Sequence, residues 1–271
     1  MRLFLYFFIF LFNSHFSKSQ SGNYQMGARS AGLGDASVTL NDPFAMFNNI
    51  GGIAGEKNFV AAFAFRNRFG LAALNSIGAG IIVPNSWGNT SINVYKFGDD
   101  LLSEHKLGLG YANKFGLVSL GLQVNYLQYQ IEDFGTAGML VLEMGGIAEI
   151  TPQLFFGAHI FNLNQARLAR NDEEKVATVM KAGLSYRPII KLMINIEAEK
   201  DIDVPAGLKA GLEYQIVSDF FIRTGIASAS RQGFYGIGFW PGRLQIDYAF
   251  NNHVKLGFSH QASLTYNLSK P

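Results

Sequence analysis

The chain has 271 residues, of which 48% are hydrophobic, 14% aromatic and 15% charged, with 30 glycines and no cysteine. Charge is too scarce for an ordinary soluble enzyme, in which about a quarter of the residues are charged, and apolar residues are too few for a helical membrane bundle. The formal charge of +2 equals the contribution of Arg2 and Lys18, so no concentrated basic face is present and a nucleic-acid partner is not expected. Without cysteine, disulfide frameworks, thiolate metal sites and cysteine nucleophiles are excluded.

The first residues have the layout of a secretory signal peptide. Arg2 gives a basic start, Leu3–Phe12 is an unbroken apolar run, and Ser17 and Ser19 place small side chains at the −3 and −1 positions of a cleavage site. An N-terminal membrane anchor is the alternative, but the run is about half of the roughly 20 residues that a bilayer-spanning helix needs. We therefore predict that residues 1–19 are a signal peptide, removed after Sec-type export. A lipoprotein is excluded because no cysteine follows.

Residues 20–56 differ from the rest of the chain. They show no alternation of polar and apolar side chains and are rich in Gly, Ala and Asn. Such a segment cannot form a domain by itself, so its role depends on what surrounds it.

From residue 57 onward the dominant period is two, which is typical of strands with one apolar face and one polar or small face. In one run, Leu120, Leu122 and Val124 alternate with Gly121 and Gln123. The pattern predicts strands near residues 57–66, 72–83, 88–98, 104–114, 117–131, 137–150, 153–163, 176–187, 190–200, 207–216, 219–227, 232–240, 243–250 and 256–268. One polar insertion, Asn164 to Lys175, is expected to be an outer loop.

A soluble sandwich would give similar alternation, but three features favour a membrane barrel. The runs are longer than the five or six residues of an average strand, aromatic residues recur near their ends like interfacial girdles, and the signal peptide provides export. The fold prediction is therefore an all-β transmembrane outer-membrane β-barrel of about 14 antiparallel strands, formed by residues 57–271. A barrel of this size needs internal filling, so we predict that residues 20–56 plug the lumen.

Charged residues at the inward positions nearly cancel. This predicts a salt-bridged, wet interior, with an ion-selective or substrate-binding lining as the alternative. The predicted lumen charge network is Lys181, Lys191, Glu197, Glu199, Lys209, Glu213, Arg223, Arg243 and Asp247. Within the plug, Arg29 is expected to pair with a lumen carboxylate such as Glu197, Glu213 or Asp247; anion binding by Arg29 is the sharper alternative.

The sequence contains no recognisable catalytic or cofactor motif. Five histidines are present, but none lies in a nucleophile elbow or at the spacing of a metal site. Pairs such as Gly108/Gly110 follow strand alternation and lack the strand-to-helix loop that cradles phosphate. We therefore expect no enzyme activity, no cofactor and no metal.

Two motifs bracket the mature chain. The first runs GARSAGLGDA from Gly27, followed by NDPFAMFNN from Asn41, and the second is DYAF from Asp247 with LGFSHQASL from Leu256. Together they resemble the PorV/PorQ family, which is related to the FadL-like barrels and is associated with type IX secretion. The resemblance implies a plug motif of Gly27, Arg29, Gly32, Gly34, Asp42, Pro43 and Asn49. This chain lacks the proline that relatives carry after Asn49, and it is too short for long cargo-holding loops.

The resemblance implies an accessory subunit of an outer-membrane machine for type IX secretion, or for assembly and export of surface proteins. Its expected partners are outer-membrane lipids and other outer-membrane or surface proteins. A FadL-like channel for small hydrophobic molecules is the alternative; it predicts an apolar pocket under the N-terminal segment and a lateral gap in the wall. The ionic lumen and the missing proline argue against it. A purely structural barrel is a third possibility.

Overall fold

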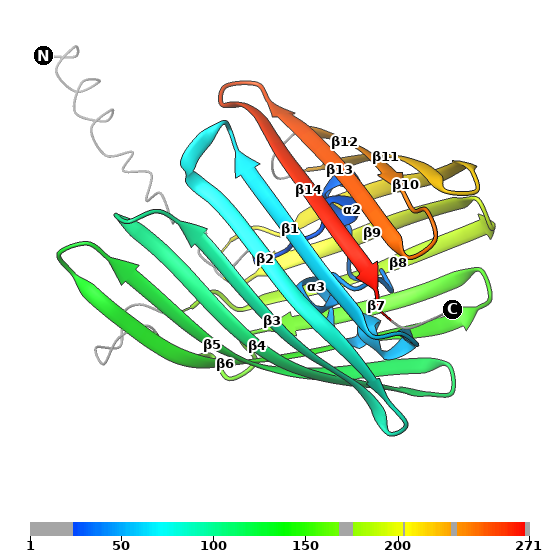
Figure 1. The fold of residues 1–271 in the computed structure, drawn as a ribbon, viewed down its shortest axis with the longest axis horizontal. Coiled ribbons are helices and arrows are strands. Elements are labelled where there is room, and N and C mark those ends of the chain that lie inside the picture. Colours follow the sequence, from blue (N-terminus) through cyan, green and yellow to red (C-terminus); the bar gives the residue numbers. More distant parts are fainter. Residues whose placement is uncertain (1–23, 168–175, 203, 229–231, 269–271) are drawn as a thin grey trace, which may run out of the picture.

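The computed structural model describes residues 24–167, 176–202, 204–228 and 232–268. They form a closed barrel in which every strand pairs with the next and β14 closes on β1 (Figure 1). The strands are β1 (Val60–Arg68), β2 (Leu71–Asn85), β3 (Gly88–Gly98), β4 (Leu102–Phe115), β5 (Val118–Ile131), β6 (Gly135–Thr151), β7 (Leu154–Phe161), β8 (Val179–Ile189), β9 (Leu192–Asp201), β10 (Gly207–Val217), β11 (Phe220–Ala227), β12 (Gln232–Phe239), β13 (Leu244–His253) and β14 (Gly257–Asn267). The prediction of a barrel of about 14 antiparallel strands is confirmed, and the sandwich is excluded.

The alternation of the sequence sets the two faces of the wall. In β5, Leu122 is 58% exposed on the outside, whereas the next residue, Gln123, is 1% exposed on the inside. Successive side chains of a strand point to opposite faces, so the period of two gives an apolar outer wall and a polar inner wall. Such an outer wall suits the hydrocarbon region of a bilayer.

The two ends of the barrel differ. At the end that we call the turn end, short connections join β2 to β3, β4 to β5 and the following pairs; one example is 116–117, where Gly116 has a φ of 61°. At the opposite end, the loop end, the connections are 69–70, 99–101, 132–134, 162–178, 202–206, 228–231 and 254–256. In outer-membrane barrels the longer loops face outside. Most of the predicted outer loop, residues 168–175, and the predicted signal peptide lie outside the described residues.

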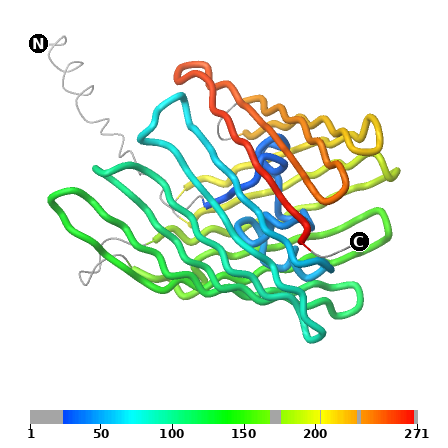
Figure 2. The backbone as a smooth tube through the Cα atoms, viewed as in Figure 1, coloured from blue at the N-terminus to red at the C-terminus, as the bar shows by residue number. Residues whose placement is uncertain are grey.

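Residues 24–56, which we call the inner segment, lie within the ring of strands (Figure 2). They contain α2 (Ala28–Gly32), α3 (Ala45–Asn48) and the 3₁₀ helix η2 (Ile50–Gly55). Met26, Leu33 and Ile53 are completely buried, and this segment provides about half of the buried apolar residues in the described part of the chain. That it closes the lumen to solutes stays a prediction. In the described part of the chain, no helix is both long enough and apolar enough to cross a membrane.

Candidate functional site

Arg29 ties the inner segment to β10. Its Nε and Nη2 atoms donate to the two carboxylate oxygens of Glu213, at 2.8 and 2.6 Å, and Nη1 lies 3.4 Å from Asp42 Oδ2. Arg223 binds the same Glu213 carboxylate at 2.6 Å and also Asp247 at 2.7 Å. Bidentate arginine–carboxylate pairs of this kind fix the relative orientation of the two side chains and also bring opposite charges together. Glu213 is one of the three carboxylates expected to pair with Arg29.

A second anchor is Glu197 on β9, whose side chain is 1% exposed. Its Oε2 atom accepts hydrogen bonds from the backbone N–H groups of Ser37 and Val38, both at 2.7 Å. Lys209 lies 3.3 Å from Glu197 and 2.7 Å from Glu199, and Lys181 lies 3.7 Å from Glu199. Glu197 therefore binds the inner segment, whereas the two ion pairs of Glu199 are with Lys181 and Lys209 of the wall.

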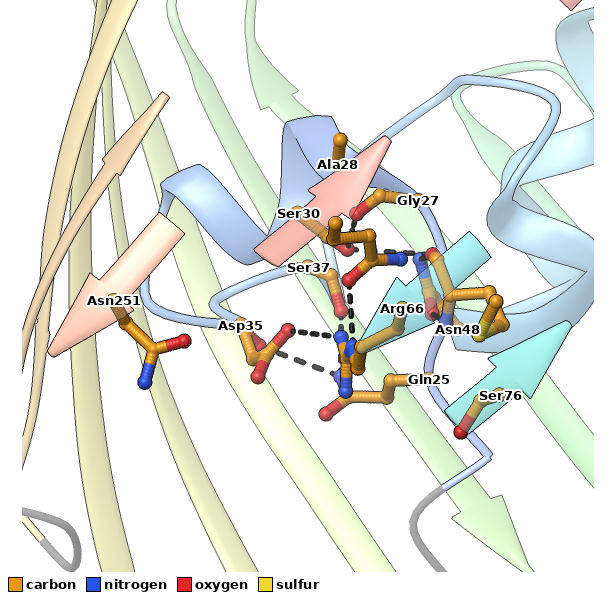
Figure 3. A network of polar contacts seen from close by, with 12 residues as sticks. Gln25, Gly27, Ala28, Ser30, Asp35, Ser37, Asn48, Arg66, Ser76 and Asn251 are labelled. Atoms are coloured by element: carbon orange, nitrogen blue, oxygen red, sulfur yellow. Dashed lines mark hydrogen bonds and ion pairs between the residues drawn. The ribbon is translucent and has the colours of Figure 1, made fainter. Parts of the chain in front are cut away.

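Asp35 forms the third anchor, shown in Figure 3. Its Oδ1 atom accepts from Arg66 Nη2 at 3.3 Å, and Arg66 Nε donates to Gln261 at 2.6 Å. Burial disfavours the ionised acid and by itself would raise the pKa of Asp35. The positive charges of Arg66 and Lys209 outweigh burial, so the pKa of Asp35 is below its ordinary value.

The small residues of the inner segment allow close contact with the wall. Gly32 packs on Gly236, where an added Cβ would lie 3.1 Å from the Gly236 Cα atom. Gly34 has a φ of 69° and abuts the backbone of Ile226. Asn49 binds the wall and the next helix: its Nδ2 atom donates to the carbonyl groups of Val38 and, on β6, Gly146, and its Oδ1 atom accepts from the Gly51 N–H at the start of η2.

The remaining residues of the predicted plug motif shape the chain locally. Asp42 Oδ1 accepts from the Phe44 N–H at 3.0 Å, which closes a turn around Pro43. Gly27 has a φ of 106° and precedes α2.

Two residues of the predicted lumen network lie elsewhere. Lys191 is exposed in the turn between β8 and β9, and Arg243 lies in the turn between β12 and β13. Their backbone carbonyls accept from the N–H groups of Gln215 and Asn267. Both residues have the odd or even sequence position that places the other charges on the inner face, but they lie in turns, beyond the ends of the strands that line the lumen.

Sequence reasoning missed a buried cluster on the opposite wall. Glu143 on β6 lies 3.4 Å from Lys106 Nζ and 3.2 Å from His159 Nε2, and it accepts from Asn125 at 2.8 Å. Lys106 also lies over the ring of Tyr24, 5.2 Å from its centroid. All three wall residues occupy inward positions, so the alternation that identified the other lumen charges could have found them. Within the described residues, no group of three or more acidic or histidine side chains is placed to hold a metal ion.

A cavity of about 380 Å³ opens at the loop end, above the inner segment. Its charged lining residues include Asp35 paired with Arg66 and Glu199 paired with Lys209, and Phe69 and Phe234 add apolar surface. Arg68 also lines the cavity, so the lining has three cations (Arg66, Arg68 and Lys209) against two carboxylates (Asp35 and Glu199).

An apolar groove of about 560 Å³ lies nearby on the outer face of the wall, lined by Ile196, Leu208, Ala210 and Ile226 among others. The groove and the cavity share three lining residues, namely Lys209, Ala227 and Gln232. In register, Lys209 pairs with Ala227, and Ala227 pairs with Gln232. One row of residues across β10, β11 and β12 therefore lies between the cavity and the groove.

Neither a protein-family profile nor a curated protein sequence matches the chain. Solved structures do match. The toluene transporter TbuX of Ralstonia pickettii superposes with a TM-score of 0.69 at 10% identity, covering 92% of this chain and 100% of that chain. The toluene transporter TodX of P. putida gives 0.69 at 9% identity, with the same coverage. A FadL homologue of Pseudomonas aeruginosa gives 0.66 at 12% identity, covering 90% and 98%.

These neighbours correct the predicted family. Two of them are toluene transporters and one is a FadL homologue, and nothing in the comparisons supports the PorV/PorQ resemblance or a link to type IX secretion. The predicted role as an accessory subunit of a secretion or assembly machine is therefore wrong. The physical reason lies in the motifs themselves: their glycines serve close packing of an inner segment on a wall, as at Gly32 and Gly236. Any barrel with such a segment needs them, so they do not identify a family.

Proposed function

We propose that this protein is a non-enzymatic outer-membrane channel that takes up small hydrophobic molecules. The observation that carries the proposal is the adjacency of the loop-end cavity and the apolar groove on the outer wall, which share Lys209, Ala227 and Gln232. The neighbouring hydrocarbon transporters support the same class of solute.

The proposed route leads from the outside into the cavity and then through the wall into the membrane. The pair Ala227–Gln232 is the last of the β11–β12 ladder at the loop end, and Lys209–Ala227 is the last of the β10–β11 ladder. Terminal pairs open at little free-energy cost compared with the centre of a sheet. Transient breaking of the strand pairing in this row would join the cavity to the groove. A hydrophobic solute would then lower its free energy by entering the hydrocarbon region of the membrane.

This route does not pass through the inner segment. The ion pairs of Arg29 and Asp35, and the backbone hydrogen bonds that Glu197 accepts, can therefore hold that segment in place during transport. An ionic interior, which the sequence suggested as an argument against a channel, is compatible with a route along its edge.

The test is uptake of radiolabelled toluene by cells that express the protein, compared with cells that lack it. Ala210 faces outward in the groove, so Ala210→Trp fills part of it and is expected to lower uptake several-fold. Ala182→Trp is the matched control, because Ala182 is an exposed outward alanine on β8 outside the groove. Uptake equal in wild-type and protein-free cells would refute the channel. Equal uptake by the two tryptophan variants would refute the wall route.

A further inference from the structure

A different part of the outer wall carries an unusual row of polar side chains. On β3 the outward positions run Ile92, Val94 and Lys96, and the first two are apolar as expected, with Val94 49% exposed. Lys96 pairs in register with His105 on β4, which in turn pairs with Gln128 on β5. Directly paired residues of neighbouring strands point to the same face, so a lysine, a histidine and a glutamine lie side by side on the face that meets lipid.

This row is exceptional for the wall. Among the described strand residues, the only charged side chains at outward positions are Lys96 and Lys200. Lys200 Nζ donates to the Val204 carbonyl at 2.5 Å. Within the described residues, the side chains of Lys96, His105 and Gln128 make no hydrogen bond or ion pair, so their donors are available to a group from outside the chain.

The row lies close to the loop end. His105 is three residues from the start of β4, and Gln128 is three residues from the end of β5, so the row is roughly 10 Å along the strands from the loop end. A charge on the lipid face is costly at the bilayer centre and cheap near the headgroups. The position thus matches the headgroup level of the leaflet on the loop side.

A groove of about 430 Å³ extends along the outer surface beside this row, and its apolar lining includes Ile77, Val94, Leu107 and Tyr126. The groove carries the charge of Lys96 at its loop-end part. Farther from the loop end it is apolar, where it is lined by Val94, Leu107 and Tyr126. A lipid has the complementary form, with an anionic phosphate above acyl chains. A lysine ammonium is a good point-charge partner for phosphate, and the histidine and glutamine N–H groups add donors.

We propose that Lys96, His105 and Gln128 form a binding site for the phosphate of a membrane lipid, whose acyl chain lies in the adjoining groove. The site would fix one lipid against β3–β5. It does not depend on the proposed uptake function, since it involves neither the loop-end cavity nor the groove at β10–β12.

The test is native mass spectrometry of the full-length protein released from micelles that contain either dioleoyl phosphatidic acid or dioleoyl phosphatidylcholine. We expect the wild-type protein to retain phosphatidic acid in preference to phosphatidylcholine. Lys96→Gln should weaken phosphatidic acid binding by about 5-fold, the effect of one lysine near a charged lipid surface, and Lys96→Arg should preserve it. His105→Ala should also weaken binding. Lys200→Gln is the matched control and should leave the affinity unchanged.

Three outcomes would overturn the site. Equal losses in Lys96→Gln and Lys200→Gln would show that any outward lysine attracts the lipid. Equal retention of the two lipids would show that only the apolar groove binds. Displacement of the lipid by inorganic phosphate would show a site for soluble anions. A heat-dependent shift in electrophoretic mobility verifies that each variant forms the barrel.

Discussion

Glu197→Gln gives a direct test of how the inner segment is held. The carboxylate accepts two backbone N–H groups, from Ser37 and Val38, and is completely buried by the protein. Hydrogen bonds to a charged acceptor contribute about 1.5–3 kcal/mol each, against about 0.5–1.5 kcal/mol for neutral ones. Glutamine keeps the shape and one acceptor oxygen but loses the charge. The loss for two bonds is therefore about 2–3 kcal/mol.

Amide hydrogen exchange at Ser37 and Val38 measures this loss. If exchange follows local release of the segment, it should accelerate about 30- to 150-fold, since 1.36 kcal/mol is a factor of ten. The matched control is Glu199→Gln, because Glu199 is the other carboxylate bound to Lys209, whereas the N–H groups of Ser37 and Val38 donate to Glu197. No acceleration in Glu197→Gln would show that packing alone holds the segment, and equal acceleration in both variants would assign the effect to the charges around Lys209 and not to the two hydrogen bonds; either result would refute this reasoning.

Two further predictions concern the same segment. Gly225→Ala should lower the thermal unfolding temperature in detergent, because the added Cβ would overlap the backbone of Leu33 and Gly34 and overpacking costs about 1–3 kcal/mol; Gly55→Ala, where the Cβ meets nothing within 4 Å, should leave it unchanged. For Asp35, the pKa is lowered in the folded protein, so its contribution to stability is present above the unfolded pKa of about 4 and is lost as the pH falls through the folded value. The protection factors of the inner-segment amides, which correct for the slower intrinsic exchange in acid, should therefore fall at acidic pH, and Asp35→Asn should reduce that dependence; an unchanged profile of protection against pH would contradict the role of the Asp35–Arg66 pair.

The wall was predictable because a strand converts sequence parity directly into inside and outside. Leu122 and Gln123 are adjacent in the sequence, yet they are 58% and 1% exposed. The short turn at Gly116 separates two runs clearly, and similar breaks gave the number of strands. Strand alternation and turn residues are read from neighbouring positions in the sequence, so this part of the fold can be predicted without knowing how the strands are arranged in space.

The ion-pair partners within the lumen were less predictable. Odd or even sequence position shows which face of the wall a side chain is on, but it does not show the position of the side chain along the barrel axis or the residue that it meets. Lys191 and Arg243 have the right parity but lie in turns. Glu197 and Glu199 are equivalent in sequence pattern, yet only Glu197 reaches the backbone of the inner segment in the hydrogen bonds described above. Such a choice depends on how the segment is threaded through the closed barrel.

The function was less predictable for a related reason. A balanced set of charges in the lumen argues against a channel only if a solute must pass those charges. In the structure the charges pair with one another and with the inner segment, as Arg29 does with Glu213. The balance of these charges therefore indicates how the inner segment is held in the barrel, and it gives no information about which solutes cross the wall.

The proposed route lies at a part of the wall where the strands are short. β11 and β12 have eight residues each, as β7 does, against fourteen for β4 and β5. A shorter ladder has fewer hydrogen bonds to hold its last pair, and that last pair lies where the cavity and the apolar groove share residues. A barrel can thus have a tightly fixed interior and still admit a hydrophobic solute, provided that one edge of its wall is short and its outer face there is hollow.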